Sequence, residues 1–213
     1  LPLGSSRLWL QAHLVTAVAS AGLFYLHTGG RWPNGWVESV LASLYLGTFA
    51  SGVLGLYLTR TIPKQLALTS EQFLFERIPH LRRQAQQQAR GVVLEAVHTT
   101  GATTLADFYV DRLHGFLQRP RAWRYFVMPN TRTRKRLFNE MAGVNRFLTE
   151  PERSACERLF DLVRRKDDLD FHAARQGLLK TWLFVHIGLT WSLVLLGAAH
   201  GVLALAFRGG PNG

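Results

Sequence analysis

Three long apolar segments restrict most strongly how this chain can fold. They are Leu8–His27, Trp36–Leu58 and Thr181–Phe207, each about 20 residues or longer and nearly free of charged side chains. A helix of that length crosses a hydrocarbon core of about 30 Å. The mean hydropathy of the 213 residues is only +0.03, because the stretch between the second and third segments is polar and basic. The sequence therefore predicts an all-α integral membrane protein with three transmembrane helices and a soluble helical insertion between helices two and three.

The predicted chain has three parts. Residues 1–59 form a transmembrane hairpin with spans at about 8–28 and 36–58, residues 60–179 form the insertion, and residues 180–213 form the third transmembrane helix with a short tail. Helix-stopping glycines, a proline and two tryptophans lie in the link between the first two spans. We therefore expect a tight turn at the membrane surface.

Short sequence signals predict that the insertion is helical. Thr69 with Gln72, and Thr149 with Glu152, have the spacing of a capping box, in which two side chains satisfy free backbone N–H groups at a helix start. Three closely spaced carboxylates come later in the insertion: Asp167, Asp168 and Asp170. Acidic side chains favour the positive N-terminal end of a helix. We therefore expect these three to open a helix that continues unbroken into the third span.

Positive charge is concentrated in the insertion. Of the 25 Lys and Arg residues, 22 lie between Arg60 and Lys180, and the formal net charge of the chain is +11. Arg60 and Lys64 follow the second span, and Arg175 and Lys180 precede the third. Basic residues beside membrane helices mark the cytoplasmic side. We therefore expect the insertion on the cytoplasmic side of a bacterial inner membrane, the turn outside, and the first and third spans parallel.

Composition and motifs exclude several classes of site. A single cysteine, Cys156, excludes a disulfide framework, a four-cysteine zinc site, an iron–sulfur cluster built by this chain alone and a c-type haem attachment. Neither a P-loop nor a strand-linked dinucleotide fingerprint occurs. The basic run Arg132–Arg136 indicates contact with anionic lipid or an acidic partner rather than nucleic acid, with a solvated helix face as the simpler alternative.

Four of the eight histidines lie within the predicted spans. His13 and His27 are on the first span, and His186 and His200 are on the third. Both pairs are 14 residues apart, which is almost four helical turns, so both histidines of a helix project from nearly the same face about 21 Å apart. Because the two spans are predicted to be parallel, His13 faces His186 and His27 faces His200. A lone intramembrane histidine often only joins helices, but polar residues at membrane depth are usually functional.

Two stacked positions with two imidazoles each suit two b-type haems. A flat macrocycle needs a slot between helices, and small residues lie between the histidines: Ala17, Ser20, Gly188, Thr190 and Gly197. Such residues are also common in membrane bundles without cofactors. Cationic side chains near the span ends are candidates to pair with haem propionates: Arg7, Arg31, Arg60 and Lys180. Arg31 and Arg60 are included in the predicted site, although ordinary topology-setting residues would occur at the same places.

The spacing of 14 residues between two histidines occurs on two helices that are separated by a helix without ligands. This arrangement resembles the di-haem core of the cytochrome b family. The transmembrane ferric reductase and NADPH oxidase group has a similar arrangement. The resemblance covers the three spans. It implies that His13, His27, His186 and His200 are axial ligands of two haem b groups, in the pairs His13/His186 and His27/His200. It also implies that electrons cross the membrane through the haem pair.

The expected function is that of an electron-transfer subunit in a larger redox complex. Those families place their haems in at least four helices, and three are predicted here. We therefore expect other membrane subunits and a separate redox protein as partners, with quinone as a further candidate. One alternative is a quinone or metal reductase that uses the same haems. Another is a haem-free assembly subunit whose histidines only join helices.

Overall fold

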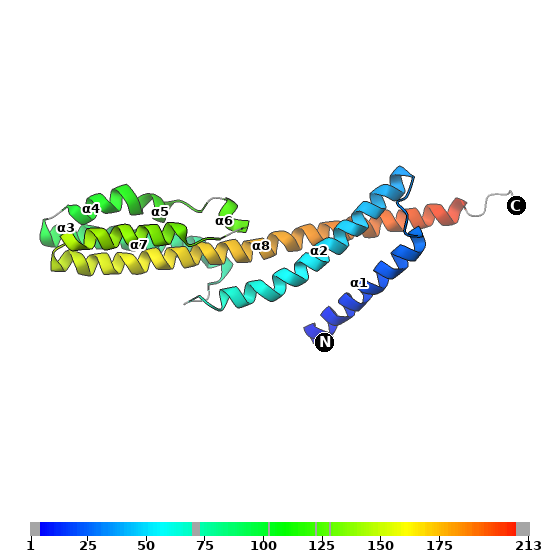
Figure 1. Ribbon diagram of the computed structural model, residues 1–213, viewed down its shortest axis with the longest axis horizontal. Coiled ribbons are helices and arrows are strands. Elements are labelled where there is room, and N and C mark those ends of the chain that lie inside the picture. The colour runs from blue at the N-terminus through cyan, green and yellow to red at the C-terminus, as the bar shows by residue number, and fades with distance from the viewer. Residues whose placement is uncertain (1–4, 70–72, 102, 122, 128, 208–213) are drawn as a thin grey trace. The chain divides into compact units, whose positions relative to one another are not determined.

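The computed structural model describes residues 5–69, 73–101, 103–121, 123–127 and 129–207 (Figure 1). These residues form helices, turns and short links, and no strand occurs among them, which confirms the predicted all-α class. The chain divides into two compact units. We call Leu1–Tyr57 with Trp182–Gly213 the apolar unit, and Leu58–Thr181 the insertion unit.

The apolar unit contains α1 (Ser6–Thr28) and parts of α2 (Trp36–Leu66) and α8 (Glu150–Phe207). All three helices contain segments long and apolar enough to cross a membrane, as the sequence predicts. Their large apolar side chains point outward: Leu26 of α1 and Leu195 of α8 are 75% and 65% exposed. Apolar side chains that face outward along whole helices suit lipid rather than water.

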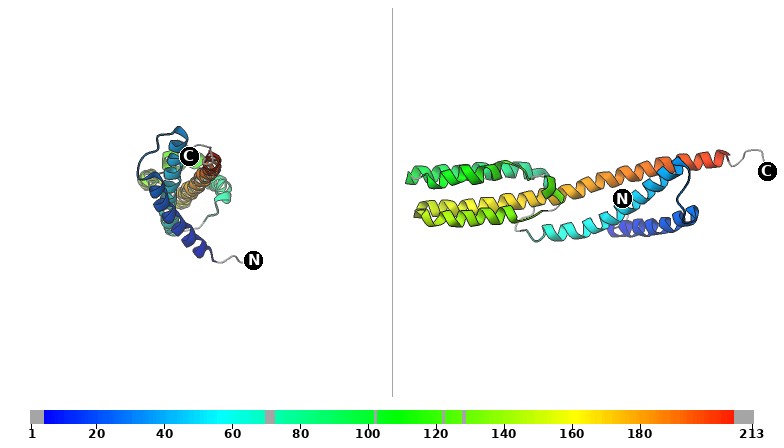
Figure 2. Two further views of the ribbon diagram at one scale, coloured as in Figure 1. Left: turned by 90° about the vertical axis from the view of Figure 1, so that its right-hand side faces the viewer. Right: turned by 45° about the horizontal axis from the view of Figure 1, so that its top comes forward.

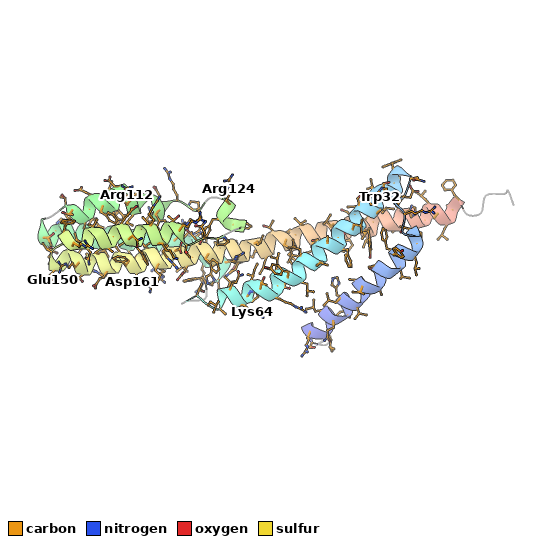
Figure 3. The ribbon with its side chains drawn as sticks, viewed as in Figure 1. Trp32, Lys64, Arg112, Arg124, Glu150 and Asp161 are labelled. Carbon is orange, nitrogen blue, oxygen red and sulfur yellow. The ribbon has the colours of Figure 1, made fainter. Side chains whose placement is uncertain are left out.

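The turn between α1 and α2 depends on two glycines. Gly29 and Gly30 have φ angles of 59° and 70°, in the left-handed region that glycine adopts without strain. Their N–H groups donate to the carbonyl oxygens of Leu26 and Tyr25 at 3.3 and 3.2 Å, which closes α1. Trp32 lies at this turn and is exposed (Figure 3). The predicted tight turn is therefore present.

The insertion unit is a bundle of helical segments. Between α2 and α8 they are η1 (Phe75–Arg77), α3 (Ile78–Thr100), α4 (Thr104–Phe108), the π-helical turn η2 (Tyr109–Leu113), α5 (His114–Gln118), α6 (Trp123–Val127), α7 (Arg132–Val144) and η3 (Asn145–Phe147). Figures 1 and 2 show α3, the run from α4 to α5, α7 and the first half of α8 side by side.

These four segments share one hydrophobic core. Ala89 of α3, Leu113 of η2, Met141 of α7 and Leu159 of α8 are each 0% exposed and belong to one cluster. Burying a Leu or Met side chain stabilises a fold by about 1.5–3 kcal/mol relative to leaving it in water. The insertion unit therefore has the core that a water-exposed domain needs.

The helix α8 is one continuous element of 58 residues. One half of its predicted capping box is present, because the Glu152 carboxylate accepts a hydrogen bond from the Thr149 N–H at 3.1 Å. The Thr149 hydroxyl donates to the same carboxylate at 3.0 Å. The other predicted box, at Thr69, involves Gln72, which lies outside the described residues.

The prediction that three aspartates open a second helix is wrong. Asp167, Asp168 and Asp170 lie in the middle of α8, which begins at Glu150, although the helix does run unbroken into the third apolar segment. Cationic side chains from other segments surround the three carboxylates, so ion pairing places them there rather than the helix dipole.

Candidate functional site

The structure brings the first predicted histidine pair together. His13 of α1 and His186 of α8 have ring centroids 6.4 Å apart, with their planes at 87°. An imidazole nitrogen binds a metal ion at about 2.0–2.1 Å, so two such nitrogens on opposite sides of one ion are about 4 Å apart. The ring centres then lie one ring radius further out on each side. The 6.4 Å between the ring centroids of His13 and His186 agrees with this expected separation.

Residues next to His186 restrain its ring. The Nδ1 atom of His186 lies 3.2 Å from the hydroxyl of Ser51 on α2. The ring stacks on Trp182 at 5.5 Å between centroids, and Trp182 Nε1 donates to the Ser51 carbonyl oxygen at 2.8 Å. With its proton on Nδ1, the imidazole donates to Ser51 and keeps the Nε2 lone pair for a metal. Such a second hydrogen bond is usual for a metal-ligating histidine.

The second predicted pair shares a cavity. His27 of α1 and His200 of α8 both line a hollow of about 380 Å³. Arg31 and Gly197 line it as well. The structure therefore places one imidazole from either helix, together with a guanidinium group, around one space.

Glycines of α2 and α8 differ in their surroundings. A Cβ on Gly55 of α2 would overlap the ring of Trp182, so the small residues of α2 serve its contact with α8. A Cβ on Gly188 or Gly197 of α8 would have no described atom within 4 Å. Packing among the described residues does not require a glycine at either place. Gly197 lies on the same side of α8 as the histidines and lines their cavity, whereas Gly188, nine residues earlier, lies on the opposite side of the helix.

The four cationic candidates have different surroundings. Arg31 lines the cavity described above, and Arg7 is exposed in the first turn of α1. Arg60 is exposed on α2, within the insertion unit. Lys180 donates to Glu76 at 2.7 Å, and this hydrogen bond lowers the pKa of the Glu76 carboxyl. Arg31 is thus the candidate that the structure brings together with predicted ligands, whereas Lys180 is engaged within the insertion unit.

The donor set fits a haem iron. Among the described residues, no group of three or more His, Cys, Asp or Glu side chains comes together as a metal site. A bare transition metal would need such a group, because protein metal sites use at least three protein ligands as a rule. A haem iron takes only axial ligands from the protein. Two imidazoles at each position could serve as such ligands.

A second polar site lies inside the insertion unit, where the sequence did not indicate one. Lys166 Nζ lies 2.5 Å from Asp170 Oδ2, and both side chains are at most 1% exposed. Arg82 pairs with Asp170 at 2.6 Å, and Arg121 pairs with Asp167. Burial lowers the pKa of Lys166 and raises that of Asp167, while their ion-pair partners shift each pKa in the opposite direction by less. Only the spacing of Lys166 and Asp170 was visible in the sequence; the arginines come from distant segments.

The remaining titratable candidates of the insertion have structural surroundings. His172 is buried, with Nε2 at 2.6 Å from the Thr69 hydroxyl and its ring edge on Phe73. Cys156 is also buried, and burial raises the pKa of its thiol to about 11. The thiol is therefore protonated at neutral pH, and neither residue offers a free ligand.

Comparison with known protein families, with curated proteins and with solved structures gives no match for this chain. The functional interpretation therefore depends on the residues and on their arrangement.

Proposed function

We propose that the chain is a membrane electron-transfer subunit that binds two b-type haems. The observation that carries the proposal is the pairing of four histidines with one repeated spacing. His13 lies beside His186, and His27 and His200 line one cavity. Random placement of polar residues at membrane depth rarely produces two matched pairs on the same two helices.

The residues of each position have defined tasks in this proposal. His13 and His186 hold one iron, with Ser51 orienting His186 through Nδ1. His27 and His200 hold the other, and Arg31 pairs with a propionate of that haem. A haem held by two histidines would supply one-electron transfer without binding substrate. The space beside Gly197, which lines the cavity of His27 and His200, leaves room for part of a macrocycle.

The surroundings of the histidines favour a complex rather than a chain that works alone. The most apolar windows of α1 and α8 contain no buried residue. A macrocycle between these helices needs flanking helices to exclude lipid and water. We therefore propose at least one further membrane subunit, and a separate redox protein that exchanges electrons with the haems. Quinone is a further candidate for that exchange.

The proposed location is the bacterial inner membrane, with the insertion unit in the cytoplasm. The supporting observation is the concentration of Lys and Arg between Arg60 and Lys180, beside the second and third spans. Cysteine labelling in intact cells, with Cys156 replaced, tests this orientation. Modification of an insertion residue by an impermeant reagent would reverse it without affecting the haem pairs.

The optical spectrum of the purified protein tests the haem proposal. Dithionite is expected to produce the bands of reduced b-type haem. His13→Ala and His186→Ala should each remove the same haem and leave the other in place, because the two residues hold one iron. His98→Ala, at an exposed histidine of the insertion unit, is the matched control and should keep both haems.

Three results would change the proposal. No haem bands in the wild-type spectrum would favour the assembly subunit without cofactor. Loss of a different haem in each of the two variants would show that the pairing is wrong. Oxidation of quinol or reduction of a ferric chelate by the chain alone would favour a reductase.

A further inference from the structure

A cavity of about 370 Å³ lies in the insertion unit beside the buried ion pairs. Four cationic side chains line it: Arg119, Arg121, Arg124 and Lys166. Asn130 and Thr133 add an amide and a hydroxyl group. Among the described residues that form its walls there is no aspartate or glutamate. The cavity therefore offers hydrogen-bond donors of positive charge and no competing carboxylate in its lining.

The two inner cations are held in place. Lys166 is 1% exposed and bonds to Asp170 at 2.5 Å. The guanidinium of Arg121 lies between two aromatic rings, 5.0 Å from the centroid of Phe116 and 4.7 Å from that of Tyr125. Cations with fixed positions lose little conformational freedom when a ligand binds. The inner wall is therefore prepared for an anion.

The two outer cations are Arg119 and Arg124, at the mouth of the cavity. Arg119 and Arg124 are exposed, and Figure 3 shows Arg124 on the short helix α6. The guanidinium groups of Arg119 and Arg124 make no ion pair with any residue that the structure describes. The cations of this region also include Arg82 and Arg134, and its carboxylates are Asp167, Asp168 and Asp170. Positive charge is thus in excess, which favours an anionic ligand.

The start of α7 adds to the positive potential. Thr133, in the first turn of α7, lines the cavity, and that turn contains no acidic residue. The side chain of the N-cap residue Thr131 makes no capping hydrogen bond. A helix N-terminus carries partial positive charge, so the basic residues Arg132 and Arg134 are unfavourable beside it. A bound anion would relieve this repulsion.

We propose that this cavity binds a phosphate group. Arg119 and Arg124 pair with its oxygens, since a guanidinium matches phosphate in two parallel hydrogen bonds. Arg121 and Lys166 supply positive charge in fixed positions on the inner wall of the cavity. The phosphate belongs to a soluble phosphorylated compound or to a lipid headgroup. Lys166 lies 15 residues before Thr181 on α8, about 22 Å of helix from the start of the apolar segment, which favours the soluble source.

Calorimetric titration of the full-length protein, kept soluble by a non-ionic amphipathic polymer that leaves vesicles intact, in a phosphate-free buffer, tests the proposal. The probes are inorganic phosphate, glycerol 3-phosphate, and vesicles with and without phosphatidic acid. The test variant combines Arg119→Gln with Arg124→Gln, which removes two exposed charges without touching the core. The matched control is Arg146→Gln, at an exposed arginine that does not line the cavity. Circular dichroism checks that both variants keep the helical content of the wild type.

The expected result is saturable binding of one phosphate group per chain, weakened about tenfold or more in the double variant and unchanged in the control. Binding of the two soluble probes supports the soluble source. Arginine-dependent binding of the phosphatidic acid vesicles alone supports the lipid headgroup. Absence of saturable binding with every probe would overturn the proposal, and so would equal affinity in the double variant and the wild type. Neither outcome depends on the haem positions, so the proposed electron transfer would remain.

Discussion

The two units of this chain differ in where their leucine side chains lie. In the insertion unit, Leu113 and Leu159 are 0% exposed, whereas Leu26 and Leu195 of the apolar unit are 75% and 65% exposed. Polar residues differ as well. Lys166 is among the most deeply buried side chains of the insertion unit, and it is compensated there by a carboxylate. The apolar unit instead has histidines within its long apolar helices, where His186 contacts Ser51 and Trp182 rather than a carboxylate.

The difference follows from the solvent that each unit must face. Apolar surface left in water costs about 25 cal/mol per Å², so a unit in water needs a core. Lipid chains are as apolar as leucine, so helices in a membrane associate through close packing and polar contacts. A matched substitution should therefore act differently in the two units. It should act on stability in the insertion unit and on polar contacts or cofactor binding in the apolar unit.

The largest effect is expected at the buried ion pairs. Asp170→Ala leaves Lys166 and Arg82 without their carboxylate and should lower the free energy of unfolding of the insertion unit by about 3–5 kcal/mol. Glu95→Ala, which breaks an exposed pair with Arg158, should lower it by less than about 1 kcal/mol. Urea unfolding of the two variants measures both values. Similar losses in the two variants would show that the ion pairs around Asp170 are exposed to water.

A core truncation should be nearly as damaging. Leu159→Ala removes a fully buried side chain and should cost about 2–5 kcal/mol of the stability of the insertion unit. Leu195→Ala, in the apolar unit, should change stability by no more than about 0.5 kcal/mol, because this side chain is already exposed. Unfolding in mixed micelles compares the two. A large loss at Leu195 would indicate that the outer face of α8 packs against a partner helix.

Substitution of two glycines should separate stability from cofactor binding within the apolar unit. Gly55→Leu forces a side chain into Trp182 and should destabilise this unit by about 1–3 kcal/mol. A Cβ on Gly197 meets no atom of another helix within 4 Å, so Gly197→Leu should leave stability unchanged, but it should reduce haem content because Gly197 lines the cavity of His27 and His200. Unfolding curves and haem spectra of both variants are the measurements. Full haem content in Gly197→Leu would place the macrocycle elsewhere.

The smallest effect is expected at Cys156. Burial raises the pKa of its thiol to about 11, so the folded state favours the neutral form and loses that advantage only as pH rises through this value. At pH 8 about one thiol in a thousand is ionised. Labelling by a thiol reagent should be slow up to pH 10 and become fast when the insertion unit unfolds. Half-maximal reactivity near pH 8.5 would show an exposed thiol.

Local sequence patterns predicted part of the structure. The three apolar segments, the glycine turn and the capping bond between Thr149 and Glu152 depend on residues close together in the chain, and the structure contains all of them. The aspartates of α8 were assigned wrongly by the same reasoning. The sequence shows a cluster of acidic residues but not the arginines opposite them, which lie 33 to 88 residues earlier. Local patterns therefore offer only the helix dipole as a partner for these carboxylates.

The sequence alone determined which helices are apolar, which are amphipathic and where the histidines repeat, because a helix has a fixed rise and a fixed turn. Those quantities place His13 and His27 on one face of α1, and His186 and His200 on one face of α8, without any knowledge of neighbours. Tertiary structure alone decided that Ser51 contacts His186 and that Lys166 and three arginines line one cavity. Such contacts join segments far apart in the chain, and local periodicity carries no information about which distant side chain completes a charge or a hydrogen bond.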